Sequence, residues 1–225
     1  MGKDNQPNAR QAAKLARKKA RRAPYERILI VSEGRKTEPH YFREIRAYYR
    51  LHTANVQVQP GALGTEPQQV VEYAERLFLR GDEGKQIQRR AFEQVYAVFD
   101  RDDHDTYHNA LRKAAALDGK LRSDLGQRVT FQAIASVPCF ELWLLLHFED
   151  VFAPVHRNEV YERLRVHVPG YDKGQDGHFE RTRRHLDAAK QRAGDLAGIH
   201  NAHDGIEPYT NVHLLVTLLT ALKSE

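Results

Sequence analysis

The sequence predicts an α/β protein in which a mostly parallel sheet of about four strands is flanked by helices. Two observations support this fold class. Short aliphatic runs alternate with longer segments of helical periodicity through residues 27–150, and turn or helix-start residues separate them. Continuous aliphatic runs are typical of strands that are covered on both faces, as in parallel sheets. Repeated strand–helix–strand order then implies right-handed crossovers with helices on both sides of the sheet.

Two strand–helix units are predicted at the start of this region. The first pairs the run Ile-Leu-Ile-Val at residues 28–31 with a helix that Thr37 would cap. The second pairs a weakly alternating segment at residues 55–59 with a helix whose capping box would be Thr65 and Gln68. Both units have the short turn between strand and helix that is typical of α/β folds.

Two more strands are expected at residues 94–99 and 129–135, with a helix between them. A strongly apolar helix is expected at residues 140–148. Residues 151–225 show helical patterns and no strand pattern, and their apolar content is low for a separate core. We therefore expect an α/β core at residues 25–150 with a helical extension packed on it.

The positive charge of the chain is concentrated at its N-terminus. The net charge is +5, yet residues 1–27 alone hold nine Lys and Arg residues against two acidic ones, so the body is slightly acidic. We expect residues 1–24 to be a flexible arm that either binds nucleic-acid phosphates or only solubilises the terminus. Its candidate phosphate-binding residues are Arg17, Lys18, Lys19, Arg21 and Arg22.

Several protein classes are excluded by composition. The single cysteine, Cys139, rules out an intramolecular disulfide framework and a cysteine-rich zinc site, and we expect it to be buried and inert. No apolar run approaches the ~20 residues that a membrane-spanning helix needs, and the basic N-terminus is not followed by the apolar stretch of a secretory signal. We expect a cytoplasmic protein without a membrane partner.

Acidic residues follow three of the predicted strands. Glu33 follows the first, Asp100 and Asp102 follow the third, and Glu141 follows the fourth. Because the carboxyl ends of parallel strands meet at one edge, we expect these side chains to gather there and to bind Mg²⁺ or Mn²⁺. Each residue alone could equally be a helix-capping, solvated or ion-paired acid, and Glu141 in particular is either a further metal ligand or a structural ion-pair member.

Basic and imidazole side chains extend this hypothesis. Arg35, Lys36 and Lys173 are candidates to bind phosphate oxygens near the metal, with ordinary surface charge as the alternative, which we favour for Lys36. His104 and His108 are four residues apart, a workable spacing for a zinc-binding pair on a helix. Because the sequence has no His-Glu-x-x-His motif and no cysteine cluster, we do not expect zinc.

Three sequence motifs resemble those of the RloB family, and a fourth segment fits. The matching region runs from residue 25 to about residue 223, and the third motif is the most specific. The motifs are Leu-Ile-Val-Ser-Glu-Gly-Arg-Lys-Thr-Glu-Pro-His-Tyr-Phe at residues 29–42, Val-Phe-Asp-Arg-Asp at 98–102, Ser-Val-Pro-Cys-Phe-Glu-Leu-Trp-Leu-Leu-Leu-His-Phe at 136–148, and Tyr-Thr-Asn-Val-His at 209–213.

The RloB family is similar to Toprim domains, the metal-binding catalytic fold of topoisomerases, primases and overcoming-lysogenisation-defect nucleases. The Toprim hallmark is a Glu after the first strand and an Asp-x-Asp after the third, which Glu33, Asp100 and Asp102 match. The resemblance implies a Toprim-like sheet, aspartates that bind Mg²⁺, and a Glu that acts as metal ligand or general acid/base. It also implies a link to prokaryotic phage-defence loci, often beside a partner ATPase.

These observations together predict a Mg²⁺-dependent nuclease that acts as an effector of antiphage defence by abortive infection. Analogy slightly favours RNA, and tRNA in particular, over DNA as the substrate. The alternative is a non-catalytic Toprim-like module that binds a partner ATPase or nucleic acid. Nucleotidyl transfer, as in primases, is a weaker third option because the sequence shows no nucleotide-binding partner domain.

Overall fold

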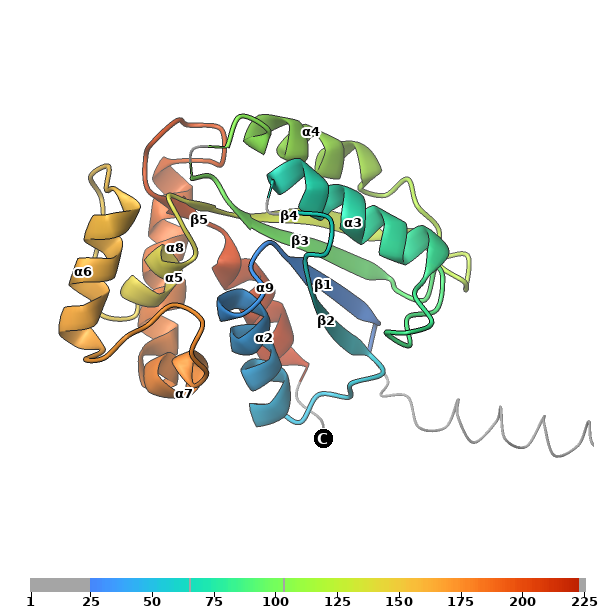
Figure 1. Cartoon of the computed structure of the whole chain (residues 1–225), viewed down its shortest axis with the longest axis horizontal. Helices are drawn as coiled ribbons and strands as arrows, with labels where there is room; N and C mark the ends of the chain where they lie inside the picture. The colour runs from blue at the N-terminus through green and yellow to red at the C-terminus, as the bar shows by residue number, and fades with distance from the viewer. Residues whose placement is uncertain (1–24, 65, 103, 223–225) are drawn as a thin grey trace, which may run out of the picture.

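The computed structural model describes residues 25–64, 66–102 and 104–222, which form a layered α/β structure (Figure 1). In chain order the elements are β1 (Ile28–Ser32), α2 (Thr37–Tyr48), β2 (Val56–Pro60), α3 (Pro67–Arg80), β3 (Gln94–Asp100), α4 (Tyr107–Leu117), β4 (Thr130–Val137), α5 (Glu141–Leu145), α6 (Arg157–His167), α7 (His178–Thr182), η2 (Arg183–His185), α8 (Leu186–Ile199), β5 (Tyr209–Thr210) and α9 (Val212–Ala221).

The described strands form one five-stranded sheet in the order β2-β1-β3-β4-β5. The first four strands are parallel, which confirms the predicted α/β fold. The fifth strand is antiparallel to β4, with Ser136 opposite Thr210, and the sequence did not predict it. A strand of two residues is too short to produce a periodic pattern, so only its pairing with β4 reveals it.

Helices cover both faces of the sheet, with α3 and α4 on one face and α2 and α9 on the other (Figure 1). Side chains of β1 alternate between the two resulting cores. Leu29 and Val31 belong to the core under α3 and α4. Ile28 and Ile30 belong to the core under α2. The aliphatic run is therefore buried on both faces, as expected for a central parallel strand.

The C-terminal helices share the core beneath α2 instead of forming a separate one. This continuous cluster of buried side chains includes Trp143 of α5, Leu164 of α6, Leu196 of α8 and Leu215 of α9, together with Ile30 of β1. The longest described helices, α3 and α8, have 14 residues each. Within the described residues, no helix combines the length and the apolar character needed to cross a membrane.

Two helix starts differ from those predicted. Thr37 is the first residue of α2, and Lys36 precedes it without a side-chain cap. The capping box of α3 consists of Glu66 and Gln69, while Thr65 lies outside the described residues. The proline at the first position of α3 explains the shift by one residue, because the N-cap is the residue directly before it.

Candidate metal centre

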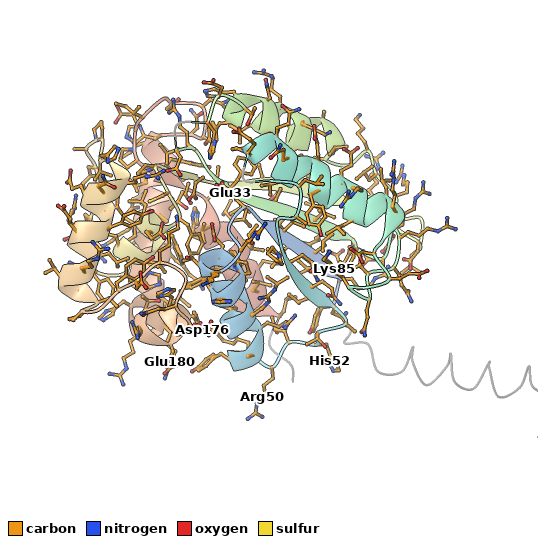
Figure 2. All side chains as sticks on the ribbon, viewed as in Figure 1. Glu33, Arg50, His52, Lys85, Asp176 and Glu180 are labelled. Carbon is orange, nitrogen blue, oxygen red and sulfur yellow. The ribbon has the colours of Figure 1, made fainter. Side chains whose placement is uncertain are left out.

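The parallel pairing of β1 and β3 brings Glu33 beside Asp100. Ser32 lies opposite Val98, so the residues that follow the two strands share one edge of the sheet. The backbone N–H of Asp100 donates a hydrogen bond of 3.0 Å to Oε2 of Glu33. Figure 2 shows Glu33 at the end of the sheet that faces the C-terminal helices. Glu33 and Asp100, which were expected at strand ends, therefore lie side by side at this edge of the sheet.

The chain turns sharply after β3. The backbone N–H of Arg101 bonds to the carbonyl of Ser136 at 2.8 Å, and that of Asp102 bonds to the carbonyl of Pro138 at 3.1 Å. Asp102 then adopts a positive φ of 37°. This conformation is costly for a residue other than glycine and is found disproportionately at functional sites. The turn places the Asp102 carboxylate close to Glu33.

Glu33, Asp102 and His104 form the candidate metal centre, because one ligand atom from each lies within 4.8 Å of the others. Nε2 of His104 lies 3.7 Å from Oε1 of Glu33. Nδ1 of the same ring lies 3.4 Å from Oε1 of Glu66. The imidazole of His104 therefore lies between the carboxylates of Glu33 and Glu66. Glu33, Asp102 and His104 are all partly buried.

The Asp102 carboxylate has one partnered and one unpartnered oxygen. Its Oδ2 lies 2.7 Å from Nη1 of Arg157 at the start of α6. Its Oδ1 is buried and has no hydrogen-bond partner among the described residues. A buried oxygen without a partner is costly, and a cation would satisfy it. Two carboxylates and one imidazole suit Mn²⁺, and they suit Mg²⁺ when waters complete its shell.

Asp100 does not join this group of three. Because side chains alternate along a strand, Asp100 shares the sheet face of Val98, which is the face covered by α2. Asp100 is only 4% exposed. Burial, and then the charges of Glu38 and Glu33, raise the pKa of Asp100 well above its ordinary value. Of the expected residues Glu33, Asp100 and Asp102, the structure therefore groups the first and last with His104 and buries Asp100 beside them.

Two further carboxylates, Glu38 of α2 and Glu141 of α5, are also buried in this region. One oxygen of each, Oε2, has no hydrogen-bond partner among the described residues. The other oxygen of Glu141 accepts a hydrogen bond of 2.9 Å from the Tyr171 hydroxyl. Burial, and then the charges of Glu141 and Glu33, raise the pKa of Glu38 to about 7. Glu141 is therefore held by a hydroxyl, and Lys173 adds an electrostatic interaction.

Lys173 lies close enough to these acids to interact with them electrostatically. Burial opposes its positive charge, but the charges of Glu141 and Asp100 contribute to raising the pKa of Lys173 above its ordinary value. The ammonium group therefore stays protonated at neutral pH. The structure therefore places the predicted phosphate-binding residue Lys173 beside the acidic group.

The other predicted phosphate-binding residues are exposed or lie outside the described residues. Arg35 and Lys36 are exposed in the turn after β1. The stem of Lys36 packs over Gly174, since a Cβ on that glycine would lie 2.8 Å from Cδ of the lysine. The basic residues of the arm lie outside the described residues; they are Arg17, Lys18, Lys19, Arg21 and Arg22.

Sequence patterns do not single out Glu38 or Arg157 as residues of the site. Glu38 resembles an ordinary acidic residue in the first turn of a helix, although it lies inside the motif at residues 29–42. Arg157 is distant from Asp102 in the chain and carries no motif. The spacing of His104 suggests only a zinc partnership with His108. Instead, the His108 ring stacks on His203, with 5.8 Å between the ring centroids.

Comparison with known proteins identifies one family. The model of a family described as RloB-like protein matches residues 28–219, which include all elements from β1 to β5 and most of α9. No curated protein and no solved structure is significantly similar to the chain. The match covers all the residues that form the candidate metal centre.

Proposed function

The chain belongs to the RloB-like protein family, and on that premise we propose that it is a divalent-metal-dependent nuclease that hydrolyses phosphodiester bonds in nucleic acid. One observation carries this proposal. Glu33, Asp102 and His104 converge at the carboxyl ends of parallel strands, and a buried oxygen of Asp102 there has no partner among the described residues.

The residues around this centre match the needs of phosphodiester hydrolysis. A bound Mg²⁺ or Mn²⁺ would neutralise phosphate oxygens and lower the pKa of a coordinated water. Glu33 and Asp102 would hold the ion by their carboxylates, and His104 would add a nitrogen donor. Arg157 and Lys173 would bind phosphate oxygens beside it, since both side chains are cationic and neighbour the acidic group.

The excess of negative charge supports a divalent ion over a monovalent one. Five carboxyl groups lie close together in this region. Burial raises the pKa of Asp100 most, and the charges of its four neighbours raise it further; they are Glu38, Glu33, Glu141 and Asp102. If all five carboxyls were ionised together, they would create a strong negative potential in a buried region, and the raised pKa values of Asp100 and Glu38 reflect that cost. A doubly charged cation offsets that potential more effectively than a single lysine can.

We extend the proposal to the substrate, the partner and the biological role by analogy with the RloB family. RNA, and tRNA in particular, is favoured over DNA as the substrate. A partner ATPase would control the activity, because an unrestrained nuclease would damage its own cell. The role would be that of an effector in antiphage defence. These assignments rest on fold-level and family-level analogy.

A second function is favoured by the ion pair between Asp102 and Arg157. The guanidinium lies 2.7 Å from one carboxylate oxygen and offsets its charge. In a non-catalytic binding module this pair would be permanent, and the chain would hold nucleic acid or an ATPase without cleaving either. The two functions differ in one measurable property, which is metal-dependent turnover.

The deciding experiment is a cleavage assay on the purified full chain. Total tRNA, single-stranded RNA and plasmid DNA would be incubated in parallel with Mg²⁺, with Mn²⁺ or with a chelator. We expect metal-dependent cleavage of the RNA substrates, reduced at least about 100-fold in Glu33→Gln and Asp102→Asn, since each removes a charged ligand. Glu83→Gln is the matched control, because Glu83 is exposed and distant from the strand ends.

The assay separates the two functions. Cleavage that survives in folded Glu33→Gln and Asp102→Asn chains would show that the activity arises elsewhere. No cleavage of any substrate, with or without an added ATPase from the same locus, would favour the binding module.

A further inference from the structure

A cavity of about 590 Å³ lies beside the candidate metal centre. It is lined by the loop between β3 and α4, the end of β4, residues 154–157 at the start of α6, and Ile206 before β5, segments that lie together in Figure 1. Its volume is within the ~300–1,000 Å³ range of small-molecule sites. Asp102 and His104 line the cavity and also belong to the metal centre. A ligand in the cavity would therefore adjoin any metal-bound phosphate.

The lining combines flat and apolar side chains. Val137, Pro138 and Val155 contribute apolar surface, and Tyr107 and His156 contribute rings. Such a lining suits a planar heterocycle, which gains from packing against apolar groups and rings. A simple sugar or a free phosphate would leave this surface without a matching partner.

Two buried hydrogen-bond donors of the lining have no acceptor among the described residues. Tyr107 is 1% exposed, and its hydroxyl has no hydrogen-bond partner there. Nη1 of Arg101 is likewise buried and unpartnered in the described part of the chain. The guanidinium carbon lies 5.8 Å from the centroid of the Tyr107 ring. Both residues line the cavity. Because unpaired buried donors are rare and costly, acceptor atoms of a ligand that reached them would satisfy them.

The rim of the cavity carries a cation suited to phosphate. Arg157 lines the cavity and pairs with Asp102 of the metal centre. Its side chain is 42% exposed, so part of it faces solvent at the rim. Arginine binds phosphate oxygens through its planar set of donors. A phosphate held there would lie between the cavity and the metal centre.

We propose that this cavity binds one unpaired nucleotide of the substrate, with the base against Arg101 and Tyr107 and its phosphate at Arg157. Carbonyl oxygens and ring nitrogens of a base supply the acceptors that the two donors lack. A base inside a stacked duplex cannot enter such a cavity, so the site selects single-stranded or unpaired positions. This inference rests on the proposed nuclease function and names the part of the substrate that is recognised.

The test is isothermal titration of the full chain with the four ribonucleoside 5′-monophosphates in the presence of Mg²⁺. Ribose 5-phosphate serves as the probe that lacks a base. None of these compounds contains an internucleotide bond, so binding is measured independently of cleavage. We expect at least one nucleotide to bind about 10-fold more tightly than ribose 5-phosphate, or more. Equal affinities, or no nucleotide binding, would overturn the proposal.

Variants locate the binding. Tyr107→Phe and Arg101→Met should each weaken nucleotide binding by about 3- to 10-fold, the range of one hydrogen bond, and leave ribose 5-phosphate binding unchanged. Tyr73→Phe and Arg76→Met are the control pair, because Tyr73 is likewise buried and Arg76 lies 5.1 Å from its ring centroid. The control pair does not line the cavity.

Substitutions at buried residues can unfold the chain, so a further variant changes an exposed residue at the cavity. Ile206 is 69% exposed, so Ile206→Trp should fold and partly fill the cavity. Ile199→Trp, at a position that is 62% exposed on α8, is its control. Nucleotide binding that is unchanged in Ile206→Trp would count against the site. If the chain binds nucleotides but cleaves no nucleic acid, the nucleotide site is supported and the nuclease function is refuted. If the chain cleaves nucleic acid but binds no nucleotide, the nuclease function is supported and the nucleotide site is refuted.

Discussion

The Glu33 carboxylate accepts a 3.0 Å hydrogen bond from the backbone N–H of Asp100, which joins the end of β1 to the end of β3. The bond engages Oε2 and leaves Oε1 at 3.7 Å from the imidazole of His104. Burial raises the pKa of Glu33, and the bond from Asp100 opposes that shift. The orientation of a candidate metal ligand therefore depends on the register of two neighbouring strands.

Glu33→Gln should separate metal binding from folding. The amide oxygen can still accept the N–H of Asp100, but the negative charge is lost. We expect Mn²⁺ to raise the Tm of the wild type but not that of Glu33→Gln, and we expect the two chains to have similar Tm values in chelator. Differential scanning fluorimetry would measure both, with Glu83→Gln as control. A full Mn²⁺ response in Glu33→Gln would contradict the assigned centre.

Glu38 should make the chain less stable as pH rises. Burial, followed by the charges of Glu141 and Glu33, raises its pKa from 4.5 to about 7 in the folded chain. The folded state thus binds this proton more tightly than the unfolded state does. The resulting stabilisation is complete below the unfolded pKa and is lost as pH approaches the folded pKa, a change of roughly 3 kcal/mol.

Glu38→Gln should remove much of this pH dependence. We expect urea unfolding in chelator to give a flatter stability profile across this interval and a higher free energy of unfolding above it, because no charge is buried at that position. Glu83→Gln should keep the wild-type profile, since its side chain is exposed. An unchanged slope in Glu38→Gln would show that Glu38 titrates normally.

The Glu38 side chain leaves no room for a side chain at position 34, which is occupied by Gly34. A Cβ on Gly34 would lie 2.0 Å from Oε2 of Glu38, far closer than atoms can approach. We expect Gly34→Ala to destabilise the chain by about 1–3 kcal/mol, the usual cost of overpacking. Gly194→Ala is the control, because a Cβ there meets nothing within 4 Å and α8 should become more stable. Chemical denaturation measures both, and equal stability of Gly34→Ala and wild type would refute the steric constraint.

Arg157 should compete with the metal for Asp102. Arg157→Gln removes the cation that lies 2.7 Å from Oδ2 of Asp102. We expect Mn²⁺ to bind roughly 2- to 10-fold more tightly, as measured by titration calorimetry, whereas nucleic acid binds more weakly. Arg163→Gln removes a comparable pair, to Glu149 at 2.6 Å, from the same helix and should change neither affinity. Weaker Mn²⁺ binding in Arg157→Gln would mean that the arginine positions Asp102.

The N-terminal arm should contribute salt-sensitive affinity. Deletion of residues 1–24 removes most of the nine basic residues near the N-terminus. We expect the plot of log affinity against log salt for single-stranded RNA to become shallower, by about 0.7 for each phosphate that the arm neutralises in the intact chain. Fluorescence anisotropy at several salt concentrations would measure this slope. An unchanged slope would identify the arm as a solubilising terminus.

Much of the fold and part of the site were predictable because their signals are local. The buried run at residues 28–31 and the acids after it lie within a few residues of one another. Parallel strands place such residues at one edge in any α/β sheet, so Glu33 and Asp102 could be paired in advance. The two-residue strand β5 could not be foreseen, because its existence depends wholly on pairing with β4.

The sequence by itself determined the α/β layering, the strand-end acids and the family. Only the tertiary structure decided that His104 stands with Glu33 and Asp102, that Asp100 is buried on the α2 side, and that Arg157 reaches Asp102 from α6. The physical reason is that strand periodicity is a local property of the chain. The left-handed turn at Asp102 and the packing of distant helices depend on contacts that form only when the chain has folded.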